Sequence, residues 1–180
     1  MAGTRRWLVV CVIAIGIVDT GRLAFAETPG QGTAEHVRSS SAIIATMIQH
    51  ATERSRTFSD LVQAISATDG IVYVEVGTCG HGRQSCFVNV TKAGPNRMLW
   101  VMLNVRGIDC DLMGLIGHEL QHTVEVLGDP QVTGFAAMYN FYSREADPGH
   151  SFPFETDGAK RAGDAVRAEV RQKNGCAKVR

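Results

Sequence analysis

The segment from Asp109 to Gly128 constrains the fold most, because its pattern predicts a helix that must pack against the rest of the chain. Its apolar residues recur at three- and four-residue spacing, as on the buried side of a helix. Asp109 or Asp111 can cap the first turn by accepting free backbone N–H groups, and Gly128 followed by Pro130 is typical of a helix end. The apolar stripe consists of Leu112, Leu115, Ile116, Leu120, Val124 and Leu127.

This predicted helix carries His118-Glu119-Leu120-Gln121-His122, an H-E-x-x-H pattern. Residues i and i+4 lie on one helical face with Cβ atoms about 5–6 Å apart, so both imidazoles can bind one metal ion. Glu119 lies roughly 100° further around the helix, where its carboxylate can act as general base on a zinc-activated water. The pattern predicts zinc ligation by His118 and His122. The alternative is a pair of histidines in ordinary hydrogen bonds on a half-buried helix.

A catalytic zinc site also needs a third protein ligand. In the longer pattern H-E-x-x-H-x-x-G-x-x-H, a glycine and a histidine would stand at positions 125 and 128. Glu125 and Gly128 stand there in this chain, which excludes that class. The ligand must therefore come from further along the chain. The acidic candidates are Glu145, Glu155 and Glu169, and His150 and Asp157 are less favoured.

Periodicity favours Glu155 among these candidates. Glu155 is the only charge on the predicted inward stripe of the last helix, where a carboxylate is costly unless it is paired or binds a metal. The alternative for Glu155 is an exposed first-turn residue stabilised by the helix dipole. Glu145 is expected in a polar loop and is the next candidate for the third ligand, whereas Glu169 is expected to be a surface charge. The other members of the stripe are Ala159, Ala162, Val166 and Val170.

His118, Glu119, His122 and Glu155 together resemble the signature of the gluzincin zinc metallopeptidases. The resemblance covers roughly residues 70 to 172, and the chain is also similar to small exported bacterial proteins of this type. It implies one zinc ion per chain, a peptide or protein substrate held along an edge strand, and peptide-bond hydrolysis with Glu119 as general base. In one departure, Ala159 stands where many members have an aspartate that orients a histidine. The residue that orients the histidine in this chain is then either Asp157 or a residue elsewhere.

The remaining patterns predict an α+β fold. Helices are expected at 36–51, at 58–65 with Thr57 in a capping box, at 135–141, and at 153–172 with Pro153 in the first turn. Strands are expected at 71–76, 86–91 and 98–105. We expect a small antiparallel sheet of about three strands packed on the motif helix, in a single zincin-like domain of residues 27–180. Gly114 and Gly117 are expected to let the sheet backbone approach that helix closely.

The first 26 residues are typical of a signal peptide. Arg5 and Arg6 precede the apolar run Trp7–Val18, and Ala24-Phe25-Ala26 forms a cleavage site, so we expect a secreted or periplasmic chain that begins at Glu27. The alternative is an uncleaved anchor. Export favours disulfides, and we favour Cys79–Cys86 and Cys110–Cys176 among three possible pairings. A zinc site of these cysteines is disfavoured, because they contain no C-x₂₋₄-C pair.

Composition limits the function classes. With 18 basic and 18 acidic residues the net charge is zero, which argues against a nucleic-acid partner. The mature chain has no apolar run long enough to span a membrane. Tyr142 and His150 are candidates to stabilise an oxyanion, although a core tyrosine and a loop histidine are the simpler interpretations. The alternative to a peptidase is a non-catalytic, zinc-stabilised structural or binding module of the cell envelope. Hydrolysis of a non-peptide amide is a third option.

Overall fold

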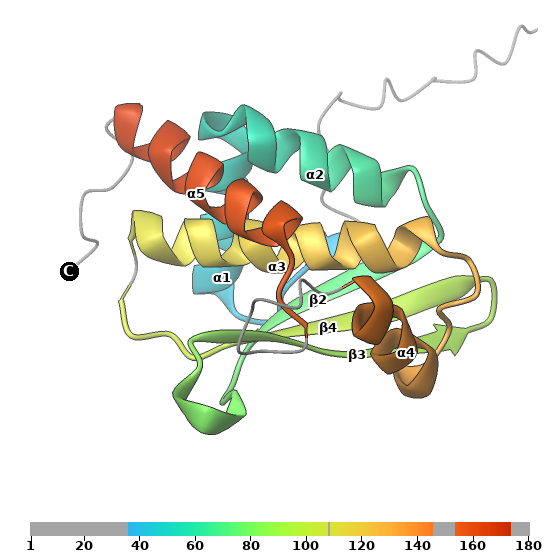
Figure 1. Ribbon diagram of the computed structural model, residues 1–180. Helices are drawn as coiled ribbons and strands as arrows, with labels where there is room; N and C mark the ends of the chain where they lie inside the picture. Colours follow the sequence, from blue (N-terminus) through green and yellow to red (C-terminus); the bar gives the residue numbers. More distant parts are fainter. Residues whose placement is uncertain (1–35, 108, 146–153, 174–180) are drawn as a thin grey trace, which may run out of the picture.

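The computed structural model describes residues 36–107, 109–145 and 154–173. These residues form an α+β fold with a four-stranded mixed sheet and five α-helices (Figure 1), which confirms the predicted class. The elements in chain order are β1 (Val37–Arg38), α1 (Ala42–Arg54), α2 (Arg56–Ser66), β2 (Gly70–Val76), the 3₁₀ turn η2 (Gly80–Gly82), β3 (Ser85–Ala93), β4 (Asn96–Leu103), α3 (Cys110–Gly128), α4 (Phe135–Glu145) and α5 (Asp157–Gln172).

The sheet is not the antiparallel sheet of about three strands that we expected. Its strand order is β1-β2-β4-β3, with β4 parallel to β2 and antiparallel to β3, and with β1 parallel to β2. Burial explains the order. Alternate residues of β4, from Arg97 to Leu103, are buried, whereas β3 is half-buried or exposed except at Val90. The hydrophobic strand therefore takes the inner position, and the more polar strand lies at the edge.

Several helix boundaries differ from those predicted. The first helix begins at Ala42 rather than His36, because Val37 and Arg38 pair with β2 and the Val72 amide donates to the His36 carbonyl at 2.7 Å. Helix α2 is capped by the Ser55 hydroxyl and not by Thr57, and helix α4 runs on to Glu145. Helix α5 begins at Asp157 behind a Thr156 cap, and the predicted start at Pro153 lies outside the described residues. The residue that caps a helix is determined by where the chain enters the helix. The periodicity of apolar residues does not specify that point.

Helix α3 lies at the centre of the packing. Figure 1 shows α3 between the sheet and α5, with α2 on the same side of the sheet. Asp109 is its N-cap and accepts from the amides of Asp111 and Leu112, which settles the choice between the two aspartates. The predicted stripe faces the core, with Leu115 and Val124 half-buried at its margins. The expected helix is confirmed from its cap to Gly128.

Cysteine pairing agrees with the expectation where it is described. A disulfide joins Cys79 to Cys86 across the loop between β2 and β3. Cys110, buried in the first turn of α3, is also disulfide-bonded. Its predicted partner, Cys176, lies outside the described residues.

Glycines bring α3 and α5 unusually close. A Cβ atom at Gly114 would lie 3.0 Å from the carbonyl oxygen of Gly163, and one at Gly117 would lie 2.7 Å from Val166 Cγ2. A Cβ at Gly163 would in turn lie 3.1 Å from His118 Cβ. We expected Gly114 and Gly117 to admit the sheet backbone, and that expectation is wrong: they admit α5. The close crossing places the N-terminal end of α5 beside the H-E-x-x-H turn.

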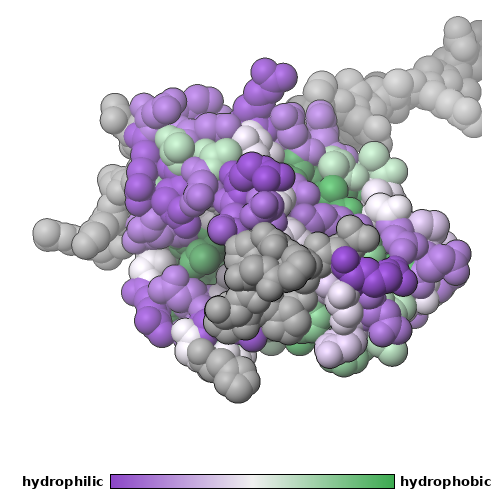
Figure 2. All heavy atoms as spheres, in the orientation of Figure 1, coloured by the Kyte–Doolittle hydropathy of each residue, from purple (hydrophilic) through white to green (hydrophobic). Residues whose placement is uncertain are grey.

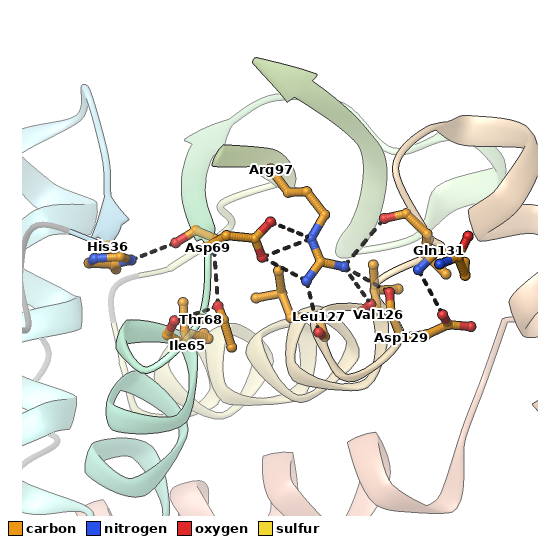
Figure 3. Close-up of polar contacts among 11 residues, drawn as sticks. His36, Ile65, Thr68, Asp69, Arg97, Val126, Leu127, Asp129 and Gln131 are labelled. Carbon is orange, nitrogen blue, oxygen red and sulfur yellow. Dashed lines mark hydrogen bonds and ion pairs between the residues drawn. The ribbon is translucent and has the colours of Figure 1, made fainter. Parts of the chain in front are cut away.

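A buried arginine fixes the other end of α3. The Arg97 side chain, on β4, donates to both carboxylate oxygens of Asp69 at 2.7–3.1 Å (Figure 3). It also donates to the Leu127 carbonyl at 2.8 Å and to the Asp129 carbonyl at 2.8 Å. The last carbonyls of a helix have no partner within the helix, so this guanidinium satisfies groups that would otherwise be buried without one. Arg97 therefore ties the end of α3 to the sheet.

The surface is mainly polar on the side shown in Figure 2, where hydrophilic residues cover much of α5. Exposed α5 residues include Arg161 and Asp164, which lie outside the predicted inward stripe. Among the described residues, no helix has the length and apolar character that crossing a membrane requires.

The glycine crossing leads to a test. We expect Gly117→Ala to lower the free energy of unfolding by about 1–3 kcal/mol, because the new methyl group overpacks against Val166. Gly128→Ala is the matched control at the end of the same helix, where a Cβ would meet nothing within 4 Å. The control is expected to leave stability unchanged or to raise it by up to about 1 kcal/mol. Urea denaturation of the metal-free protein measures both, and equal effects would contradict the proposed packing constraint.

The Arg97 contact predicts a pH dependence of stability. Hydrogen bonds from Arg97 lower the pKa of Asp69 below its ordinary value, although partial burial opposes this. The ionised carboxylate therefore stabilises the fold above the unfolded-state pKa of about 3.9, and this contribution is lost as the pH falls through the folded-state pKa. We expect Asp69→Asn to cost about 1 kcal/mol at pH 7 and progressively less below about pH 4. Urea midpoints measured across this pH range test the expectation, and a cost that stays constant from pH 7 to pH 3 would contradict it.

Candidate metal centre

Two histidines and one glutamate converge at the N-terminal end of α5. His118 and His122 lie one turn apart on α3, with ring centroids 4.9 Å apart, and Glu155 lies in the segment that leads into α5. One ligand atom from each of the three side chains lies within 4.8 Å of the other two. The distance from His118 Nε2 to Glu155 Oε1 is 3.6 Å. The structure thus brings together the three residues that the sequence indicated as a ligand set.

Glu155 reaches this position by a different route from the one predicted. It is not part of the helical stripe, because α5 begins two residues later and Thr156 is the cap. The remaining stripe residues are buried as expected: Ala159, Ala162, Val166 and Val170. Glu155 Oε1 is buried and has no hydrogen-bond partner among the described residues. A buried carboxylate oxygen in that state costs free energy unless another group, such as a cation, satisfies it.

Among the described residues, no other third-ligand candidate joins the group formed by the two histidines and Glu155. Glu169 is not a free surface charge: its carboxylate accepts from the Thr57 amide at 3.1 Å and from the Ser55 hydroxyl at 2.7 Å, and so caps α2. Asp157 is exposed in the first turn of α5. Glu145 is the last residue of α4 and not part of a loop. His150 lies outside the described residues.

Glu119 faces the same site from the next position on α3. Glu119 is 3% exposed, and its Oε2 atom has no hydrogen-bond partner among the described residues. Burial raises the pKa of Glu119 above its ordinary value, while the neighbouring charges of His122 and Arg83 act in the opposite direction. A buried carboxyl group beside the ligand set is suited to proton transfer within the site.

A pocket of about 310 Å³ opens over these residues. The start of β3 forms one wall, and α4 together with Phe154 forms another. The lining residues outside the ligand set and Glu119 are Arg83, Gln84, Ser85, Cys86, Phe87, Leu115, Met138, Tyr142 and Phe154. Its size lies at the lower end of the range for small-molecule sites, about 300–1,000 Å³. The lining combines a few charged and polar side chains with a larger number of apolar ones, which suits a group that is oriented by a few polar contacts.

Two partners of His122 were not identified from the sequence. Its Nδ1 atom lies 3.2 Å from Glu125 Oε2, and the Tyr142 hydroxyl donates to its backbone carbonyl at 2.9 Å. Tyr142 is 1% exposed, which confirms the simpler interpretation of a core tyrosine. Glu125 entered the sequence argument only as a residue that excluded one class of site. Its i+3 spacing from His122 was the available signal, since such pairs are neighbours on a helix.

The two histidines have opposite pKa shifts. Burial lowers the pKa of His118, and the nearby charge of His122 lowers it further. For His122 burial acts in the same direction, but the hydrogen bond with Glu125 and the charge of Glu119 outweigh it and raise the pKa overall. The environments are unequal because His122 has a hydrogen bond with the Glu125 carboxylate at 3.2 Å, whereas the carboxylate of Glu155 lies 3.6 Å from His118 Nε2.

The donor set fits zinc. Imidazole nitrogen and carboxylate oxygen are ordinary zinc ligands, and in a tetrahedral site with bonds of about 2.0–2.1 Å the ligand atoms lie about 3.3 Å apart. The spacing between His118 and Glu155 is already close to that value. The unsatisfied Glu155 oxygen gives the same indication, because a bound cation would satisfy it.

Comparison with known proteins gives no match. No protein-family model matches the chain, and neither a curated protein nor a solved structure does so.

The geometry predicts that zinc binding depends on Glu155. We expect Glu155→Ala to weaken zinc affinity by more than about 100-fold, since loss of a direct ligand exceeds the 10–100-fold typical of outer-shell changes. Competition with a chromophoric chelator measures the affinity, and metal analysis of the purified protein measures the stoichiometry. Asp157→Ala is the control, because Asp157 is exposed in the first turn of α5, and this variant should keep its zinc. Loss of zinc in Glu145→Ala instead would overturn this ligand assignment.

Proposed function

We propose that this protein is an exported zinc-dependent peptidase with a zincin-like site. The observation that carries the proposal is the convergence of His118, His122 and Glu155 on one point, with Glu119 buried beside them in the same pocket. Each of these residues was indicated by sequence spacing, and the fold brings them together from two separate segments. The resemblance to the gluzincins adds the substrate class.

His118, His122 and Glu155 would hold the metal. When bound there, zinc would act as a Lewis acid that polarises the substrate carbonyl and makes water more acidic. Glu155 is the only carboxylate in the ligand set, so its charge partly offsets that of the cation. Three protein ligands would leave a fourth position for water or substrate, as a catalytic zinc site requires and a purely structural site does not.

Glu119 is the proposed general base. Its carboxylate lines the pocket and is shielded from bulk water, so it can take a proton from the attacking water and pass it to the departing amine nitrogen. Glu119 is not in the ligand group, which leaves it available for proton transfer.

The sheet edge offers a place for an extended substrate. β3 lies at the end of the strand order, and its first residues line the pocket. An extended peptide that adds to this edge would pass directly over His118 and Glu119, with its main chain hydrogen-bonded to β3. The disulfide between Cys79 and Cys86 holds the start of β3 and supports a location in an oxidising compartment, either secreted or periplasmic.

Glu119→Gln tests the chemistry. The amide keeps nearly the same shape but cannot take a proton, so we expect one bound zinc per chain and a loss of peptide hydrolysis of about 100-fold or more. Metal analysis and cleavage of a peptide library by mass spectrometry measure the two quantities. Glu53→Gln, an exposed helical glutamate, is the control.

Full activity of Glu119→Gln would rule out this mechanism. Zinc binding without cleavage in the wild-type protein would favour the alternative of a non-catalytic, zinc-stabilised structural or binding module. Cleavage only of cell-wall amides would favour the other alternative, hydrolysis of a non-peptide amide.

A further inference from the structure

We infer that Glu125 is a positioning residue that holds His122 and the Glu155 segment in one arrangement for the metal. The inference rests on the proposed function, because it concerns the same centre. It assigns to Glu125 the role that an aspartate after the ligand glutamate would have had and that Ala159 cannot perform.

The first contact concerns His122. Glu125 Oε2 lies 3.2 Å from His122 Nδ1, one helical turn away on α3. An imidazole has two ring nitrogens, so this hydrogen bond commits Nδ1 and leaves Nε2 for the metal. The bond also fixes the rotation of the ring, and a carboxylate behind an imidazole makes it a more basic ligand. His122 is thus prepared as a ligand by its own helix.

The second contact joins the two halves of the site. The other carboxylate oxygen, Glu125 Oε1, accepts from the Thr156 hydroxyl at 2.9 Å. Thr156 directly follows Glu155 in sequence, and its hydroxyl oxygen also accepts from the Ala159 amide at 3.1 Å as the cap of α5. One hydroxyl therefore donates to α3 and accepts from α5. Glu125 holds the ligand His122 with one oxygen and the neighbour of the ligand Glu155 with the other.

The surroundings leave Glu125 little freedom to move. Gln121 Nε2 donates to Glu125 Oε1 at 3.3 Å, and the Glu125 side chain is 19% exposed. A Cβ atom at Gly158 would lie 2.7 Å from that oxygen, so the first turn of α5 rests directly on the carboxylate. Asp157, the substitute suggested by sequence, is exposed instead. A carboxylate with both oxygens engaged and its position restricted on both sides is suited to positioning rather than to proton transfer.

The first test measures zinc affinity in Glu125→Gln. The amide can keep a contact with Thr156 but loses the charge behind His122, and we expect zinc binding to weaken by about 10–100-fold. The urea midpoint of the metal-free variant should stay near that of the wild type. Absorption of the Co²⁺-substituted protein gives a second readout, and its visible bands should shift because the ligand geometry changes. Glu53→Gln is the matched control and should alter none of these.

The second test examines the same connection from Thr156. We expect Thr156→Ser, which keeps the hydroxyl, to retain wild-type zinc affinity, and Thr156→Val to lose about 10-fold or more. The same measurement on the double variant of Glu125→Gln and Thr156→Val should show less than the product of the two losses, because both variants break one connection.

The outcomes separate this inference from the proposed function. A wild-type protein that binds no zinc overturns both. Tight zinc binding by the wild type together with equal affinity and an unchanged Co²⁺ spectrum in Glu125→Gln overturns only the inference. A fall in metal-free stability that accounts for the whole loss of affinity would also overturn it, since Glu125 would then be a structural residue alone.

Discussion

The close crossing of α3 and α5 is the constraint on which the rest of the structure depends. Backbone meets backbone where Gly114 faces Gly163, and Val166 fills the space that a side chain at Gly117 would need. A helix pair with larger residues at these positions would lie further apart, and the segment before α5 would move away with it. The proposed metal centre is therefore a product of helix packing: the distance between Glu155 and the two histidines is determined by residues that bind nothing.

Buried polar contacts keep α3 and α5 in that relation. Arg97 holds the C-terminal carbonyls of α3 to Asp69 and the sheet, and Glu169 on α5 caps the first turn of α2. Both contacts join segments distant in sequence through a charged group whose partners include helix-terminal backbone atoms. Such groups must be paired when they are removed from water, so each contact selects one arrangement of the helices over nearby alternatives. Figure 3 shows the Arg97 guanidinium between the Asp69 carboxylate and the backbone carbonyls at the end of α3.

Chemistry at the centre divides among residues with distinct surroundings. Glu119 and Glu155 have buried oxygens with no hydrogen-bond partner among the described residues, whereas both oxygens of Glu125 are engaged. This contrast separates carboxylates that are available to a metal or a reacting water from one that supports a ligand. The pocket lies on the side of the available groups, beside the edge strand, so substrate, metal and base would meet at one place.

Local sequence determined the elements whose hydrophobic period is unbroken, which are the helix that carries His118, Glu119 and His122 and the strands β2 and β4. It also indicated the short loop that a disulfide closes. It also indicated Glu155, although for a reason that was partly wrong, since the residue precedes the helix and is not part of its stripe. Only the tertiary structure decided the strand order, the approach of α5 to Gly114 and Gly117, and the partners of Arg97 and Glu125. Periodicity reports which face of an element is buried, because that depends on neighbours within a few residues. It does not report which distant segment covers that face, because this depends on how all the elements pack at once.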